Sequence, residues 1–362
     1  MRSSAIISFI LFFLICSAIG QSGRVREYSE SSSPKDKSVE IFLPSTVNSE
    51  QKHLNNDEET IRVDTDLVII PSQISDRSGK PVNDIAKEEF KIFENGIEQE
   101  IAYFSSEEQP FTVALVLDMS YSSVFKLPEI QAAALAFINQ LHENDKVMVV
   151  SFDEKIRILC EATTNRKALR LAVEGARIAS GTSLYEAMDT VLNKKLRQIS
   201  GRKAVILLSD GVDTSSQRQT PAAILRDAAE TEVLIYPIRY DTYDDVQKSR
   251  KESAQIFYDE NDRPYTVETS RVKGERIEDY RNAKEFTEQI ASQSGGKVYR
   301  VSRAANLNRA FSQIAEELRQ VYNLGYYPNS ERKNGVLFSI KVRVYRSDLI
   351  IRARNSYFWK SK

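Results

Sequence analysis

The sequence predicts an α/β fold in which a doubly wound, mostly parallel sheet is joined to a small β-sandwich-like module. Two wholly apolar runs, residues 113–117 and 204–208, are typical of central parallel strands that helices cover on both faces. Around them, segments with helical periodicity alternate with short strand-like runs, which is the pattern of a doubly wound sheet. Extended segments precede and follow this region, and we expect them to form the β module together.

The first twenty residues predict a cleaved signal peptide. Arg2 precedes an almost unbroken apolar run at residues 5–15, and small residues then stand where a signal peptidase reads. An uncleaved anchor is the alternative, although the run is short for a membrane span. Residues 21–58 are rich in Ser, Glu, Lys, Asp and Asn, which predicts a flexible leader. We therefore expect an exported protein, located in the periplasm, on the cell surface or outside the cell.

Both flanks of the α/β region have strand-like patterns. Between residues 60 and 108, an alternating run meets the turn Asn95-Gly96, which is a strong hairpin signal. Between residues 327 and 358, two extended runs are joined by a polar turn. We expect these two flanks to pair with each other and to complete the β module.

Residues 110–325 alternate strands with helices. The helices are predicted from apolar residues that recur on one face, and the strands from short apolar runs. In chain order we expect strands at 113–117, 147–152, 204–208, 233–238 and 298–301, and helices at 127–141, 166–179, 184–199, 221–230, 284–292 and 307–322. Residues 241–281 are highly charged and poorly periodic, which indicates an insertion or a long surface loop.

Composition excludes several classes of function. The formal net charge of the 362 residues is −1, so nothing indicates an electrostatic partner such as nucleic acid or an anionic membrane. The chain has only two histidines, His53 and His142. This scarcity disfavours histidine-based catalysis and histidine-rich metal sites.

Oxygen-bearing side chains directly follow the first apolar strand. Asp118, Ser120 and Ser122 alternate along the chain, so one turn can aim all three at a common point. Ligands of open α/β sheets gather at the carboxyl ends of the strands. One carboxylate and two hydroxyls are hard donors that suit Mg²⁺ or Mn²⁺ in six-fold coordination. Tyr121, between two of these donors, is expected to lie at the rim and to contact a partner.

Two more oxygen donors stand at equivalent places. Thr182 lies in the loop before the helix that begins at residue 184, and Asp210 follows the second apolar strand. Each donor has a simpler alternative. Asp118 could be a helix N-cap, Thr182 with Ser183 could cap the next helix, and Asp210 could be a turn residue.

The three pieces resemble the metal-ion-dependent adhesion site of von Willebrand factor type A domains. They are Asp-x-Ser-x-Ser at 118–122, Gly-Thr-Ser-Leu-Tyr at 181–185 and Leu-Leu-Ser-Asp-Gly-Val-Asp at 207–213. All five donor positions match, and the resemblance covers roughly residues 110–325. The flanks contain Val63-Asp64-Thr65-Asp66-Leu67-Val68, Glu89-Phe90-Lys91-Ile92-Phe93-Glu94-Asn95-Gly96, Tyr322-Asn323-Leu324-Gly325-Tyr326-Tyr327-Pro328 and Ile351-Arg352-Ala353-Arg354. These segments are similar to a bacterial family of VWFA-related secreted proteins, which extends the resemblance to about residues 60–358.

The resemblance implies a Rossmann-like fold with one divalent cation, either Mg²⁺ or Mn²⁺, with Ca²⁺ also compatible. Its ligands would be Asp118, Ser120, Ser122, Thr182 and Asp210. The resemblance further implies that a protein partner offers an Asp or Glu carboxylate to the metal. Since only two of the five donors are anionic, the dication would still attract an external carboxylate. We therefore expect a non-catalytic binding or adhesion protein whose partner is neither nucleic acid nor a small-molecule substrate.

Two other functions stay open at this point. In a structural or assembly component of the cell envelope, the same metal site would be stabilising or vestigial. The enzymatic alternative is a Mg²⁺-dependent phosphohydrolase, but such enzymes need a second Asp two residues after the first, where this chain has Ser120. The chain also lacks the Gly-x-Ser-x-Gly elbow of serine hydrolases and the phosphate-binding loop Gly-x-x-x-x-Gly-Lys-Ser/Thr.

Overall fold

The structure is a computed structural model that describes residues 67–266, 270–302, 304–329 and 332–359. The signal peptide and the leader predicted for residues 1–58 lie outside the described residues. Within the described ranges, no helix combines the length and the apolar character needed to span a bilayer.

A six-stranded sheet forms the centre of the α/β region, in the order β12-β9-β8-β5-β6-β7. Its strands are β5 (Phe111–Asp118), β6 (Lys146–Phe152), β7 (Ile156–Thr163), β8 (Arg202–Ser209), β9 (Val233–Arg239) and β12 (Tyr299–Arg300). Five strands run parallel, and only the edge strand β7 is antiparallel to its neighbour. Every residue of β5 is buried, as expected for a strand covered on both faces. The predicted mostly parallel α/β sheet is confirmed.

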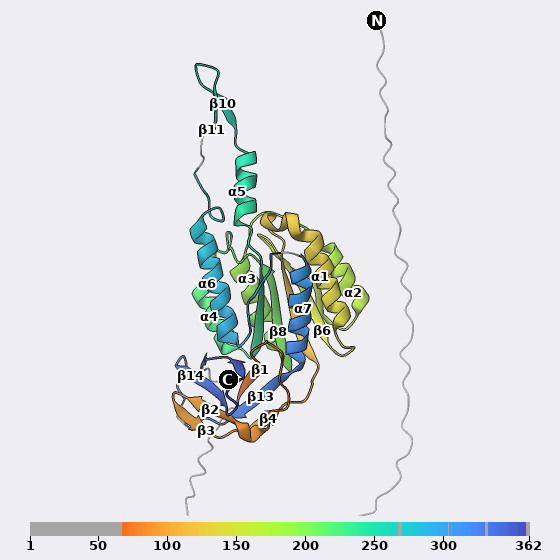
Figure 1. The fold of residues 1–362 in the computed structure, drawn as a ribbon, viewed down its shortest axis with the longest axis vertical. Helices are drawn as coiled ribbons and strands as arrows, with labels where there is room; N and C mark the ends of the chain where they lie inside the picture. Colours follow the sequence, from red (N-terminus) through yellow and green to blue (C-terminus); the bar gives the residue numbers. More distant parts are fainter. Residues whose placement is uncertain (1–66, 267–269, 303, 330–331, 360–362) are drawn as a thin grey trace, which may run out of the picture. The chain divides into compact units, whose positions relative to one another are not determined.

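Helices cover both faces of this sheet (Figure 1). Helices α1, α2 and α7 pack on one face, and α3, α4 and α6 pack on the other. Their bounds are α1 (Leu127–Gln140), α2 (Arg166–Gly175), α3 (Leu184–Asp189), α4 (Pro221–Glu230), α6 (Ile277–Ser294) and α7 (Ala304–Arg319). A π-helical turn (Thr190–Lys195) and a 3-10 turn (Leu196–Gln198) continue α3, so the helix predicted at 184–199 is present as one helical segment.

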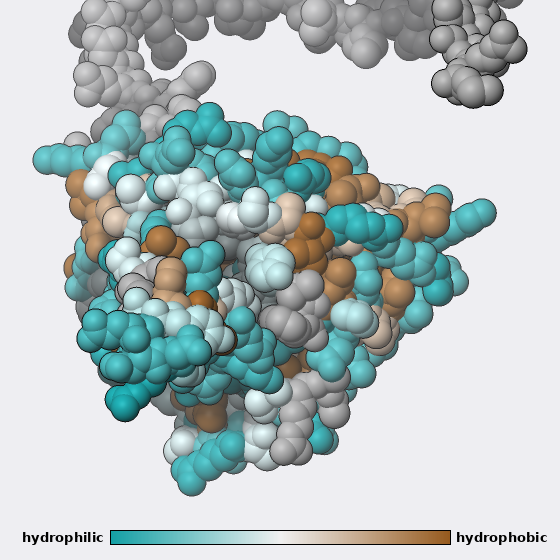
Figure 2. All heavy atoms as spheres, turned by 90° about the horizontal axis from the view of Figure 1, so that it is seen from above, coloured by the Kyte–Doolittle hydropathy of each residue, from teal (hydrophilic) through white to brown (hydrophobic). Residues whose placement is uncertain are grey.

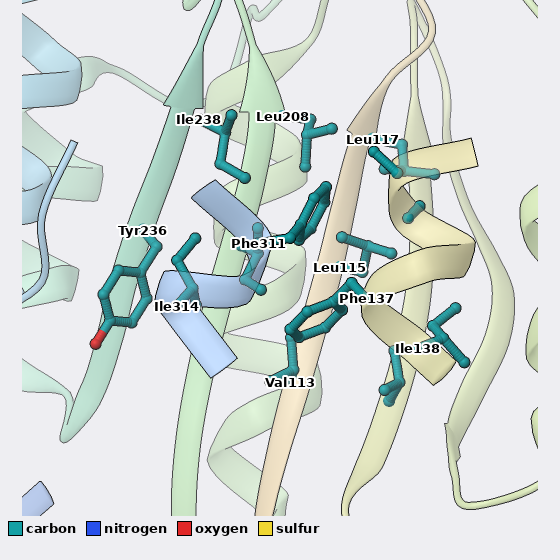
Figure 3. Close-up of a cluster of buried hydrophobic side chains, with 14 of the residues drawn as sticks. Val113, Leu115, Leu117, Phe137, Ile138, Leu208, Tyr236, Ile238, Phe311 and Ile314 are labelled. Carbon is teal, nitrogen blue, oxygen red and sulfur yellow. The ribbon is translucent and has the colours of Figure 1, made fainter. Parts of the chain in front are cut away.

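The core on the first face is built from aliphatic and aromatic side chains of β5, α1 and α7 (Figure 3). Phe137 of α1 and Phe311 of α7 are fully buried, and their ring centroids lie 5.1 Å apart. Both pack in one cluster with Val113 and Leu115 of β5. Burying each such side chain contributes roughly 1.5–3 kcal/mol, so this layer holds the carboxyl edge of β5 in a fixed place.

Described residues of the segment predicted as an insertion or a surface loop form an arm. The arm consists of α5 (Tyr243–Glu252) and a hairpin of β10 (Ile256–Tyr258) and β11 (Pro264–Thr266). It rises from the end of the central sheet that lies opposite the β module (Figure 1). No residue of α5 is buried, so the helix has no apolar stripe that periodicity could reveal. Helix α6 begins at Ile277, shortly before the approximate end that was expected for the insertion at residue 281.

The flanks form two antiparallel four-stranded sheets that share one apolar core. The first sheet, in the order β15-β1-β13-β4, contains β1 (Val68–Ser75), β4 (Tyr103–Ser105), β13 (Val321–Tyr326) and β15 (Ile350–Ala353). The second, in the order β16-β14-β2-β3, contains β2 (Phe90–Glu94), β3 (Ile97–Gln99), β14 (Leu337–Val344) and β16 (Ser356–Phe358). A short 3-10 helix (Lys87–Glu89) precedes β2.

The boundary between the α/β region and the C-terminal flank differs from the expectation. Helix α7 ends at Arg319, and Val321–Tyr326 forms β13, which pairs with β1 and β4. The sequence predicted a helix through residue 322 because Val321 and Tyr322 continue the apolar spacing of α7. These residues form a strand because they pair with strands more than 200 residues away in the chain. Local periodicity cannot reveal such distant pairing. The division predicted at residues 325–327 therefore lies before Val321.

A polar network joins the β module to the central sheet. Arg352 of β15 forms an ion pair of 2.7 Å with Glu317 of α7, whose side chain is only 5% exposed. Tyr299 of β12 donates to the same carboxylate over 3.0 Å, and Arg352 also donates to Gln73 of β1 over 2.8 Å. These contacts span elements from both ends of the chain, so they fix the module against the α/β region.

Candidate metal centre

Asp118 is the last residue of β5 and is completely buried. The chain turns directly after it, and the backbone N–H of Ser120 donates to Asp118 Oδ1 over 2.9 Å. Ser209, the last residue of the adjacent strand β8, donates its hydroxyl to Asp118 Oδ2 over 2.5 Å. The carboxylate is therefore held by one donor from its own turn and one from the neighbouring strand.

Four of the five predicted donors meet at this edge of the sheet. The hydroxyls of Ser120 and Ser122 lie 3.1 Å apart, and Ser122 donates to Asp210 Oδ2 over 3.0 Å. Asp210 follows β8, and its Oδ1 accepts from the backbone N–H of Val212 over 3.0 Å. Ser209 lies 91 residues after Asp118 in the chain, and Asp210 follows Ser209 directly. The parallel pairing of β5 with β8 brings Asp118 and Asp210 to the same edge of the sheet.

Thr182, the fifth predicted donor, lies in the adjoining loop before α3 and is buried. Its backbone N–H donates to Ser215 Oγ over 3.1 Å, and its carbonyl accepts from Thr214 and Ser215. Gly181 precedes it at φ +78°, where a Cβ would stand 2.6 Å from Ser215 Oγ, so the loop requires glycine there. Among the described residues, the Thr182 hydroxyl has no hydrogen bond to the other four donors.

The capping alternatives for these residues do not match the observed contacts. Ser120, not Asp118, is the N-cap of the 3-10 helix Tyr121–Lys126, and it forms no side-chain cap bond. Ser183 is the N-cap of α3, again without a side-chain cap bond. Glu186, which would complete a capping box, instead accepts from the backbone N–H groups at 217 and 218.

The two carboxylates lie in an unfavourable environment for negative charge. Burial, and then the charge of Asp210, raises the pKa of Asp118 to about 7. Burial also raises the pKa of Asp210, although hydrogen bonds from Thr242, Val212 and Ser122 act in the opposite direction. In the described part of the chain, neither carboxylate has an ion pair with Lys or Arg. A bound cation would stabilise both charged forms.

The donor set suits a hard divalent cation better than a soft one. Two carboxylates and several hydroxyls supply only oxygen ligands. Within the described ranges, no three His, Cys, Asp or Glu side chains gather into a group that could hold a metal. The hydroxyls of Ser120, Ser122 and Thr182 would therefore have to complete the coordination sphere of an ion between Asp118 and Asp210.

Sequence reasoning missed two residues that position these carboxylates. Ser209 holds Asp118, and the buried Thr242 donates its hydroxyl to Asp210 Oδ2 over 2.6 Å. Thr242 follows β9, the next parallel strand after β8, so the rule that functional groups gather at the carboxyl ends of strands points to it as well. Tyr121, predicted at the rim, is 65% exposed.

The five predicted donors lie in a part of the chain that is similar to a known family. The family model for the von Willebrand factor type A domain matches residues 113–212. An uncharacterized protein of Synechocystis is 30% identical over 106 residues, which is 28% of this chain and 25% of the relative. The chain thus matches only a quarter of that relative's length.

Two solved structures are similar at low identity. The von Willebrand factor type A protein from Catenulispora acidiphila is 13% identical with a TM-score of 0.43, covering 82% of this chain and 74% of that one. The mussel byssus proximal thread matrix protein 1 was solved with zinc in its metal-ion-dependent adhesion site (MIDAS) motif. It is 14% identical with a TM-score of 0.42, and the match covers 64% of this chain and 50% of that one.

Proposed function

We propose, from the premise that this chain carries a von Willebrand factor type A domain, that it is an exported, non-catalytic protein that binds a protein partner through a divalent cation. The predicted signal peptide at residues 1–20 supports export. The oxygen donors gathered at the carboxyl edge of the sheet support the binding function. The expected location is the periplasm, the cell surface or the exterior.

The observation that carries this proposal is the pair of buried carboxylates at the edge of the sheet. Asp118 and Asp210 repel each other in a site without a basic partner among the described residues, and each has a raised pKa. The surrounding groups are hydroxyls, which can coordinate a cation but cannot neutralise a carboxylate. Mg²⁺ held by Asp118, Ser120, Ser122, Thr182 and Asp210 would offset this repulsion.

The partner's contribution follows from the charge of the site. A dication that faces only two carboxylates and neutral hydroxyls still attracts a further anion. Ser122 is half-buried and Tyr121 is exposed beside it, so this is the side from which a partner can approach. We propose that an Asp or Glu carboxylate of the partner protein reaches the ion there.

The test combines metal titration with partner capture from a native envelope extract. The full chain should bind Mg²⁺ in calorimetry, and it should retain envelope proteins in Mg²⁺ but release them in chelator. Asp118→Ala and Asp210→Ala should lose both properties while the circular dichroism spectrum stays unchanged. Asp244→Asn is the matched control, because Asp244 is an exposed carboxylate at the start of α5. Equal capture in Mg²⁺ and in chelator would contradict the proposal.

The burial of the donors favours a second function, in which the ion only stabilises the fold. Asp118, Ser120, Thr182 and Asp210 are each at most 5% exposed. Such burial also suits an ion that only stabilises the fold of an envelope assembly protein. This alternative predicts that Mg²⁺ raises the melting temperature while partner capture is the same with and without chelator.

A further inference from the structure

A hollow of about 960 Å³ lies directly beside the candidate metal centre. Tyr121 and Ser122 line one part of it, and Ser122 is also one of the five proposed metal ligands. The arm lines most of the rest, through α5 and both hairpin strands, and Arg271 and Glu275 between the hairpin and α6 also contribute. A partner that offers a carboxylate to the metal would therefore also face the arm.

The arm presents apolar surface towards solvent. Phe257, which lines the hollow, is 41% exposed, and its ring lies 5.9 Å from that of Tyr265 on the opposite strand. The hairpin pairs with no other described strand, and a two-stranded sheet alone is marginally stable in water. Figure 2 looks down on this end of the molecule, where apolar patches lie among hydrophilic residues. Exposed apolar patches with polar rims mark interaction sites.

Among the described residues that line the hollow, cations outnumber anions. Five charged side chains of the described residues line it, namely Asp245, Arg250, Lys251, Arg271 and Glu275. Glu275 lies 3.4 Å from Arg250, and Asp245 lies 3.8 Å from Lys126, so both carboxylates have a cation beside them. Lys251 and Arg271 are exposed and form no ion pair with a described residue. The hollow is therefore complementary to an acidic ligand.

We propose that the hollow binds an extended acidic segment of the partner protein, with a bulky apolar side chain close to the carboxylate that faces the metal. This inference rests on the proposed function, because the metal anchors the segment. An extended chain advances about 3.3 Å per residue, so a few residues can reach from the metal into the hollow. Phe257 and Tyr121 would contact the apolar side chain, and Lys251 and Arg271 would pair with additional Asp or Glu residues.

The probe is a library of short synthetic peptides with one central Asp and randomised flanking positions. The full chain captures peptides from this library in Mg²⁺ and, separately, in chelator. In Mg²⁺ we expect enrichment of Phe, Tyr or Leu and of Asp or Glu in the flanks. Exposed ion pairs of about 1 kcal/mol correspond to enrichment of about fivefold for the acidic residues.

Charge reversal tests the two cations directly. The double variant Lys251→Glu/Arg271→Glu should lose the acidic preference, and Phe257→Ser should lose the apolar preference. Both should keep Mg²⁺-dependent capture of the central Asp, since neither changes a metal donor. Lys248→Glu is the matched control, because Lys248 is an exposed lysine of α5 that does not line the hollow. It should select the same peptides as the unmodified chain.

The possible failures separate the two proposals. Mg²⁺-dependent capture of the central Asp without a flanking preference, or with the same preference in the double variant, would overturn the role of the hollow and leave the metal-dependent binding function intact. If the unmodified chain captured these peptides equally in Mg²⁺ and in chelator, the proposed function itself would fail, and the role of the hollow with it.

Discussion

Replacing Asp118 by Asn removes one charge from the buried carboxylate pair and keeps the size of the side chain. Burial and the neighbouring Asp210 raise the pKa of Asp118 to about 7 from 3.8. Without metal, the folded chain therefore binds a proton at this site more tightly than the unfolded chain does. A raised acidic pKa means that stability is lost as the pH rises from about 4 to about 7. The Asp118→Asn variant should lack this pH-dependent loss of stability.

The pKa sets the size of the effect. A rise of about three units corresponds to at most about 4 kcal/mol at pH 8, at about 1.4 kcal/mol per unit. In chelator at about pH 8, Asp118→Asn should thus be more stable than the unmodified chain by up to that amount, or up to about 10 °C in Tm. Magnesium at about 100 times its Kd should narrow the difference by about 2.7 kcal/mol, because only the unmodified chain keeps the full site.

Scanning calorimetry in chelator, at about pH 5 and about pH 8, measures this difference. The Tm of the unmodified chain should fall more steeply with pH than that of Asp118→Asn. The slope that remains in the variant belongs to Asp210 and other groups. Asp244→Asn controls for the loss of an exposed carboxylate and should follow the unmodified chain. Identical pH slopes for the unmodified chain and Asp118→Asn would refute the buried like-charged pair.

Three further variants test contacts around the site and the module. Thr242→Val removes the hydroxyl that donates to Asp210 over 2.6 Å and should weaken Mg²⁺ binding about tenfold in calorimetry; unchanged affinity would show that this contact does not orient the ligand. Gly181→Ala introduces a Cβ at φ +78° and should lower the free energy of unfolding by about 1–3 kcal/mol, measured with urea; a neutral result would contradict the strained loop. Arg352→Met removes the 2.7 Å ion pair with Glu317 and leaves Lys297, at 3.9 Å, as its neighbouring cation; it should cost up to about 3 kcal/mol in the same assay, whereas a loss below about 1 kcal/mol would mean that the network is dispensable.

The central sheet could be predicted because its signals are local. The apolar runs in β5 and β8 have no polar residue at alternating positions, which only a strand covered on both faces tolerates. Once these strands are placed, Asp118 and Asp210 must lie at one edge, and the structure shows them linked through Ser122. The ligand roles of the five donors stay a prediction until a metal is observed.

The remaining features depend on contacts that no local pattern encodes. Strand β13 exists because β1 and β4 pair with it, although its first residues continue the spacing of α7. Helix α5 buries no residue, so it carries no amphipathic signal. Thr242 is an ordinary threonine in sequence, and only the parallel order of β8 and β9 brings its hydroxyl to Asp210.

Anomalous diffraction from crystals of the full chain grown with Mn²⁺ tests the metal centre most directly. The account predicts one strong peak at the carboxyl edge of β5 and β8, surrounded by side-chain oxygen atoms of Asp118, Ser120, Ser122, Thr182 and Asp210. No peak at this edge, or a peak held by other side chains, would contradict it.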